Sequence, residues 1–227
     1  MKKTFLSPRL LEAVGVACRV HAPMIRKGDG SPYIVHPMAV FGLLVHWGAD
    51  EDTCIAGLLH DVIEDAEDDS KRSEYRKEIE EKFGKDVLEI VEGVTEQDKS
   101  LPWKERKKLY LKHLKVASKE SLLVSCADQT HNMKSLLASY NKEGEEVWKR
   151  FNAGKEEKLW FSRECWKQYA EKLDSRFVEE LKDTLQLLCH LALPDFGAQH
   201  FAYDDQWKKP TSHVPCANGR DENVVLS

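Results

Sequence analysis

The chain has 227 residues, a formal net charge of −5, 32% charged and 41% hydrophobic residues, a balance typical of a globular protein with a core. The acidic balance argues against a nucleic acid polymer as partner, because such partners require a basic surface. No apolar run reaches the ~18 residues of a membrane span and the N-terminus lacks the apolar segment of a signal peptide, so we expect a cytoplasmic protein without a membrane segment.

Apolar residues recur at helical spacing along nearly the whole chain, and no useful length shows the alternation typical of strands. This pattern predicts an all-α fold. The expected helices cover residues 8–20, 37–47, 50–63, 73–83, 85–94, 103–116, 119–140, 155–173 and 176–193. Pro37 suits a helix start and Gly48 a helix end. We assign one domain to residues 1–195 and an irregular polar tail to residues 196–227.

The third expected helix ends in a cluster of polar side chains. After the apolar run Ala-Gly-Leu-Leu, the chain reads His60-Asp61-Val-Ile-Glu64-Asp65. On a helix, His60 lies one turn from Glu64, and Asp61 lies one turn from Asp65. Three carboxylates at one helix end repel one another unless a cation compensates their charge, so the cluster indicates a bound metal ion.

Two residues distant in the sequence complete a donor set. His36 precedes Pro37 and is expected at a helix start, because the residue before proline avoids helical backbone angles. Asp128 interrupts an apolar stretch, where an ionised carboxylate needs a partner or a metal. For His36 the alternative is an ordinary capping or core histidine. For Asp128 the alternative is that its helix simply has a solvated face. Two imidazoles and two carboxylates suit Mn²⁺, and Fe²⁺ or Zn²⁺ less specifically.

Further polar residues share the expected helix with Asp128. Asn132 and Ser135 follow it at spacings of four and seven, which places all three on one helical stripe. His131 points elsewhere on this helix, and we interpret it as structural or exposed. The stripe therefore predicts a polar wall beside the metal.

Arg26 and Lys27 lie in a loop rich in turn residues. With two Asp ligands neutralising a divalent metal, Glu64 and Asp65 leave the site near −2, a poor place for a polyphosphate. Arg26 and Lys27 would restore the balance and bind phosphate oxygens. The alternative is a solvated basic turn.

Four segments, in order along the chain, resemble the motifs of one family. Residues 26–37 resemble R-K-x-G-x-P-Y-I-x-H-P, and residues 58–65 resemble L-L-H-D-x-x-E-D. Residues 91–95 resemble V-x-G-V-T, and residues 127–133 resemble A-D-x-x-H-N-M. These are motifs of the RelA/SpoT-type HD hydrolases. A chain this short, with no synthetase domain, is most similar to their branch of small alarmone hydrolases.

The resemblance implies an HD-domain helical bundle of about eight to ten helices. It also implies a Mn²⁺ site with the ligands His36, His60, Asp61 and Asp128. In the family, the substrate is a small anionic nucleotide with a 3′-pyrophosphate, such as ppGpp. Water cleaves the 3′ ester, which releases pyrophosphate and a 5′-diphosphate nucleotide.

The same resemblance gives roles to the remaining polar residues. Glu64 and Asp65 would serve catalysis by orienting the water and moving its proton. The implied substrate contacts are Arg26, Lys27, Asn132 and Ser135.

The chain departs from the family pattern around the fourth motif. The family often has Lys before the motif's Asp, Arg just after it, and then Leu, where this chain has Ser125, Gln129 and Thr130. These changes concern the nucleotide side, so ppApp and pppApp stay open as substrates beside ppGpp and pppGpp. Two other functions also stay open: a metal-dependent phosphatase on another nucleotide, such as a phosphorylated nicotinamide cofactor, and a retired HD domain that binds nucleotide without turnover. No oligomeric state is predicted.

Overall fold

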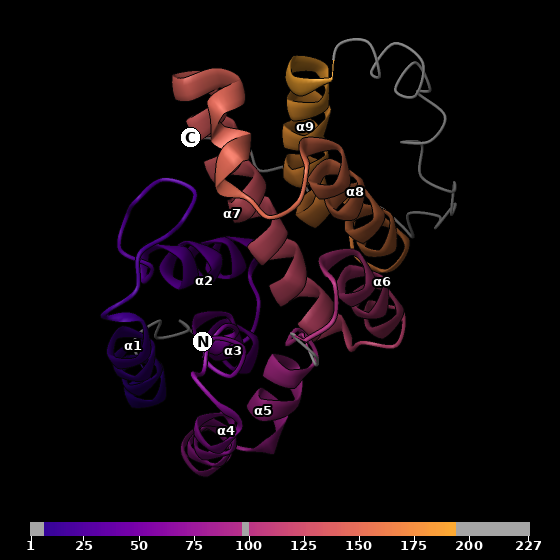
Figure 1. Ribbon diagram of the computed structural model, residues 1–227. Helices are drawn as coiled ribbons and strands as arrows, with labels where there is room; N and C mark the ends of the chain where they lie inside the picture. Colours follow the sequence, from indigo (N-terminus) through magenta and orange to yellow (C-terminus); the bar gives the residue numbers. More distant parts are fainter. Residues whose placement is uncertain (1–6, 97–99, 194–227) are drawn as a thin grey trace, which may run out of the picture.

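The computed structural model describes residues 7–96 and 100–193. Within these ranges it contains nine α-helices, one 3₁₀ helix and no β-strand, which confirms the predicted all-α class (Figure 1). The elements are α1 (Pro8–His21), α2 (Val35–Trp47), α3 (Glu51–Leu59), α4 (Asp69–Phe83), α5 (Lys85–Glu92), α6 (Trp103–Leu114), α7 (Lys119–Glu143), the 3₁₀ helix η1 (Gly144–Arg150), α8 (Lys155–Lys172) and α9 (Ser175–Ala192). The tail predicted for residues 196–227 lies outside the described residues. Across the described ranges, no helix combines the length and apolar character needed to cross a membrane.

The long helix α7 is the element around which the others pack. It contacts α2, α3 and α5 from the N-terminal part of the chain, and α8 and α9 from the C-terminal part (Figure 1). Residues 121–127 of α7 are buried without interruption, so this segment has no solvated face. Asp128 follows directly, which places a carboxylate in the interior of the fold.

A glycine sets the distance between α2 and α3. A Cβ atom on Gly57 would lie 2.3 Å from Leu44 Cδ1, so a larger residue would displace a fully buried leucine. Gly48, at φ 76°, ends α2 in the left-handed conformation, at the position predicted for the helix end. Asp50 then caps α3 by accepting a hydrogen bond from the Thr53 N–H. The close packing of α2 against α3 brings the first turn of α2 beside the end of α3.

Several helix boundaries differ from the prediction. The α4 helix begins before the predicted residue 73, because the Asp68 carboxylate caps its first turn. The α2 helix begins at Val35, so His36 lies within its first turn rather than before it. Pro37 is tolerated there because the first helical N–H groups have no partner within the helix. The 3₁₀ helix η1 was not predicted from the sequence.

Candidate metal centre

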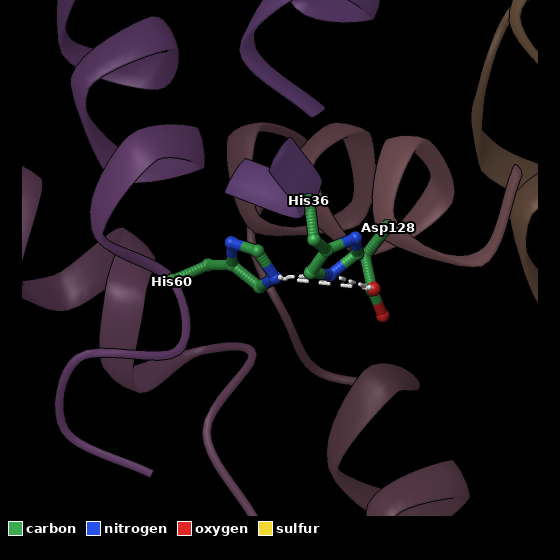
Figure 2. Close-up of side chains that lie close together, drawn as sticks. All are labelled: His36, His60 and Asp128. Carbon is green, nitrogen blue, oxygen red and sulfur yellow. Dashed lines mark hydrogen bonds and ion pairs between the residues drawn. The ribbon is translucent and has the colours of Figure 1, made fainter. Parts of the chain in front are cut away.

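Three polar side chains from distant segments meet in the interior. His36 comes from α2, His60 follows α3 directly, and Asp128 comes from α7 (Figure 2). One ligand atom of each lies within 4.8 Å of the others. His36 Nε2 is 3.0 Å from Asp128 Oδ1 and 3.2 Å from His60 Nε2. The structure thus brings together three of the four predicted metal ligands.

The fourth predicted ligand, Asp61, lies beside both imidazoles. Its Oδ2 atom is 3.1 Å from His60 Nε2 and 3.5 Å from His36 Nε2. The same oxygen accepts a hydrogen bond of 2.7 Å from the Tyr33 hydroxyl. Tyr33 therefore holds the Asp61 carboxylate against the two rings.

The segment that carries His60 and Asp61 is not helical, so the predicted helix to residue 63 is wrong at its end. The α3 helix ends at Leu59, and the following residues to Asp65 form turns. Val62 and Ile63 within these turns are fully buried, and their burial fixes the path of the chain. Adjacent side chains on an α-helix do not face the same way. Because the chain leaves the helix after Leu59, the imidazole of His60 and the carboxylate of Asp61 can both lie beside the His36 ring.

The outer ring nitrogens of both imidazoles are engaged. His60 Nδ1 lies 2.9 Å from the Gly57 carbonyl oxygen. A carbonyl can only accept, so this nitrogen carries the hydrogen and leaves Nε2 of the neutral ring with a lone pair. His36 Nδ1 lies 2.7 Å from His131 Nδ1, with the ring centroids 4.9 Å apart. This contact corrects the interpretation of His131 as pointing away from the site.

The cluster is buried and requires positive charge. Burial lowers the pKa of His60, but the carboxylates of Asp61 and Asp128 outweigh it and raise that pKa to about 10. Burial raises the pKa of Asp61, but His60 and His36 outweigh it and the pKa falls below its usual range. The pKa of Asp128 is also lowered, against the effect of burial, by His36 and His60. A metal-free cluster therefore keeps a proton on His60 between two ionised carboxylates.

These residues fit a divalent cation. Imidazole nitrogens and carboxylate oxygens converge, and the two carboxylates supply the negative charge that offsets a divalent ion. The cation would take the place of the proton on His60, so its binding would release that proton. The side chains of Asp61 and Asp128 stay 16% and 19% exposed, which leaves the cluster open to a cavity.

Glu64 and Asp65, the predicted catalytic pair, line the same cavity and are half-buried. Glu64 Oε2 accepts a hydrogen bond of 3.2 Å from the Glu96 backbone N–H. The group of described side chains whose ligand atoms lie within 4.8 Å of one another contains neither of them, and it does not contain Asp61 either. The pair lines the same cavity as the metal cluster.

The predicted substrate contacts line this cavity of about 520 Å³ as well. They are Arg26, Lys27, Asn132 and Ser135. Arg26 Nη2 donates to Asn132 Oδ1 at 3.2 Å, and Asn132 Nδ2 donates to Asp128 Oδ1 at 2.6 Å. Asn132 thus connects a cation of the loop with a carboxylate of the metal cluster.

Two lysines that sequence reasoning missed also line the cavity. Lys158 on α8 places its Nζ 4.1 Å from the centre of the Phe151 ring, and Lys107 on α6 places its Nζ 4.6 Å from that of Phe161. Burial and the neighbouring charge of Lys107 lower the pKa of Lys158 to about 8. Both lysines lie in strongly charged helices, where their spacing gives no signal that separates them from surface lysines.

The residues that depart from the family pattern are tied into the cavity wall. Ser125 Oγ is 2.7 Å from the Tyr110 hydroxyl and 2.6 Å from the Tyr169 hydroxyl. Gln129 Oε1 accepts a hydrogen bond of 3.1 Å from Ser162 Oγ. Ser125 and Gln129 themselves carry no charge, and the nearby cations of the cavity are Lys158 on α8 and Lys107 on α6, the latter paired with Glu96.

Comparison with known proteins gives one family throughout. The profile of the HD domain family matches residues 13–157. The guanosine-3′,5′-bis(diphosphate) 3′-pyrophosphohydrolase MESH1 of Xenopus tropicalis is 41% identical over 130 residues, which cover 56% of this chain and 69% of that protein. The bifunctional (p)ppGpp synthase/hydrolase SpoT of Escherichia coli is 38% identical over 134 residues, which cover 56% of this chain but 18% of that protein.

A solved structure shows the same arrangement of helices. It is described as a metazoan ortholog of SpoT that hydrolyzes ppGpp. The two chains are 25% identical and superpose with a TM-score of 0.66, covering 81% of this chain and 97% of the other. The similarity therefore includes nearly the whole of that relative.

Proposed function

Because this chain belongs to the HD domain family, we propose that it is a metal-dependent hydrolase that removes the 3′-pyrophosphate from alarmone nucleotides. The substrates are ppGpp and pppGpp or their adenosine analogues, and the products are pyrophosphate and a 5′-phosphorylated nucleotide. The observation that carries the proposal is the convergence of two imidazoles and two carboxylates beside a second acidic pair, in a cavity that an arginine and three lysines also line.

The proposed metal is Mn²⁺, held by His36, His60, Asp61 and Asp128. When bound there, the cation supplies a more acidic water and a polarised phosphoryl oxygen. The chain's own contribution is to hold the donors in place. Tyr33 fixes the Asp61 carboxylate, and Asn132 fixes that of Asp128.

Glu64 and Asp65 are the proposed groups that act on the attacking water. Their carboxylates line the cavity beside the cluster, where they can accept a hydrogen bond from water and take its proton. The Glu96 N–H limits the directions in which Glu64 Oε2 can point. The metal and the proton acceptor are therefore assigned to different side chains.

The cavity offers both charge and ring surfaces to a phosphorylated nucleotide. Arg26, Lys27, Lys107 and Lys158 line it. Guanidinium and ammonium groups bind phosphate oxygens through charge-assisted hydrogen bonds. The Trp103 ring lines the same cavity and presents a surface on which a nucleobase can stack.

The proposed hydrolase domain spans residues 1–195, and the proposed place of action is the cytoplasm. The family match at residues 13–157 falls inside this range. The elements that line the cavity, from the loop after α1 to α8, also fall inside it.

A product assay tests the function directly. The protein, loaded with Mn²⁺ or stripped with a chelator, is incubated with ppGpp, pppGpp, ppApp and pppApp. We expect release of pyrophosphate from at least one of them, loss of this activity on chelation, and its return when Mn²⁺ is added back. The ratio of kcat/KM between the guanosine and adenosine substrates then gives the base preference.

The other outcomes of this assay identify the alternatives. Orthophosphate released from a phosphorylated nicotinamide cofactor, with the alarmones left intact, would replace the proposal by a nucleotide phosphatase. Tight nucleotide binding without any product, in the presence of Mn²⁺, would identify a retired binding domain.

The lowered pKa of Lys158 predicts how substrate binding depends on pH. Its ammonium is charged below about pH 8 and neutral above it. We therefore expect KM to rise as the pH passes this value, because a phosphate contact loses its charge. Lys158→Ala is expected to raise KM at pH 7 by roughly 10–100-fold, the equivalent of a charge-assisted hydrogen bond of about 1.5–3 kcal/mol.

An arginine at this position tests the assignment. Its guanidinium stays charged at all these pH values, so Lys158→Arg should flatten the rise of KM. Lys172→Ala, at the exposed end of the same helix, is the matched control and should leave the profile unchanged. The same rise of KM in the arginine variant would show that another group titrates.

A further inference from the structure

We propose that His131 is a positioning residue that fixes His36 in the tautomer required of a metal ligand. This inference rests on the proposed function, because it concerns the metal centre of that reaction. The motif places His131 one turn after Asp128 on α7, so a single helix would supply both a ligand and the support of a second ligand.

The contact between the two histidines has a defined direction. Their Nδ1 atoms are 2.7 Å apart, so one carries a hydrogen and the other accepts it. His36 Nε2 faces Asp128 Oδ1 at 3.0 Å, and this is the nitrogen that would bind a metal. A neutral ring that offers Nε2 must carry its hydrogen on Nδ1. His36 is then the donor and His131 the acceptor.

The other side of His131 agrees with this direction. If its Nδ1 accepts, the hydrogen of the neutral ring lies on Nε2. That atom is 3.4 Å from the hydroxyl oxygen of Ser135, one turn further along α7, which can accept it. The hydrogen bonds are therefore donated outward, from His36 to His131 and from His131 to Ser135.

The two histidine ligands differ in how they are supported. His60 Nδ1 bonds to the backbone carbonyl of Gly57, which no substitution of a side chain removes. His36 depends on a side chain, so its support can be altered while its own ring stays. Partners of this kind around a metal ligand typically change metal affinity by roughly 10–100-fold when mutated.

Three variants separate the hydrogen bond from packing. His131→Phe keeps a ring but removes the acceptor, and we expect it to weaken Mn²⁺ binding by roughly 10–100-fold in equilibrium dialysis. His131→Asn places an amide oxygen near the position of Nδ1 and should recover most of the affinity. His46→Ala removes an exposed histidine from α2, the helix that carries His36, and should bind Mn²⁺ like the unmodified chain.

A measurement on the unmodified chain does not depend on how the variants fold. With diamagnetic Zn²⁺ in place of Mn²⁺, ¹H–¹⁵N spectra of the imidazole rings report which nitrogen carries the hydrogen. We expect Nδ1–H on His36 and Nε2–H on His131. Nδ1–H on His131 would overturn the inference, as would Mn²⁺ affinity unchanged in His131→Phe.

These failures differ from a failure of the proposed function. If the unmodified chain binds Mn²⁺ and cleaves an alarmone while His131→Phe keeps full affinity, the inference is wrong and the function stands. If the unmodified chain binds no divalent metal, both are wrong.

Discussion

Asp61→Ala is expected to remove metal binding and hydrolysis together. The substitution deletes the carboxylate oxygen that lies 3.1 Å from His60 Nε2 and 3.5 Å from His36 Nε2. Two imidazoles and one carboxylate would remain, and the loss of one ligand and one negative charge should weaken Mn²⁺ binding strongly. A bound metal contributes several kcal/mol to the transition state. The rate of pyrophosphate release should therefore fall by at least roughly 1,000-fold, since about 1.4 kcal/mol corresponds to a factor of ten.

Metal content and kcat/KM should be measured on the same preparation of this variant. Asp183→Ala, which removes an exposed carboxylate from α9, is the matched control and should keep both. Far-ultraviolet circular dichroism checks that the helices persist, because the Tyr33 hydroxyl loses its acceptor in the variant. Full metal content without activity would show that Asp61 acts on the substrate or the water and is not a ligand.

The helices were predictable because their signal is local. A stripe of apolar residues at helical spacing identified α9 and α5 with ends close to those observed. The end of α3 was not predictable in this way. Residues 60–65 continue a helical pattern, and the burial of Val62 and Ile63 against other helices turns the chain instead. Tertiary packing overrides the local pattern at the place where two metal-site side chains are needed.

The polar residues of the site were found by their chemistry. A carboxylate within the apolar segment of α7 needs compensation wherever the segment folds, and this requirement singled out Asp128. The direction assigned to His131 was wrong, because only the stripe of Asp128, Asn132 and Ser135 was expected to face the site. His131 lies about 60° from Asp128 around the helix axis. The first turn of α2 covers this flank, which the sequence of α7 does not reveal.

The lysines of the cavity could not be chosen from the sequence at all. Lys107 and Lys158 are two of 34 basic residues, and both lie in helices with many charges. They were identified by the packing of α6 against α8, which turns both toward the cavity. A requirement for charge compensation can identify ligands that bind one ion closely. It gives no such guide to cations that surround a larger ligand.

Glu64→Gln is expected to abolish most of the activity while Mn²⁺ binding stays intact. Glu64 lines the cavity beside the proposed ligands, and the role proposed for it is on the water. An amide oxygen can still accept the hydrogen bond from the Glu96 N–H, so the local structure should persist. An amide cannot take a proton from water, and the loss of a general base typically lowers kcat by roughly 10²–10⁴-fold. Asp65→Asn tests the other member of the pair by the same measurements.

The loss of Mn²⁺ binding compared with the loss of activity decides whether Glu64 acts on the metal or on the water. An enzyme that lacks a ligand recovers activity when Mn²⁺ is raised, whereas one that lacks a base does not. We therefore expect kcat of Glu64→Gln to stay low at every Mn²⁺ concentration, with normal metal content. Glu67→Gln, an exposed acid in the same connection, should behave like the unmodified chain. Recovery of Glu64→Gln at high Mn²⁺ would instead make Glu64 a ligand and leave Asp65 as the remaining candidate for the base.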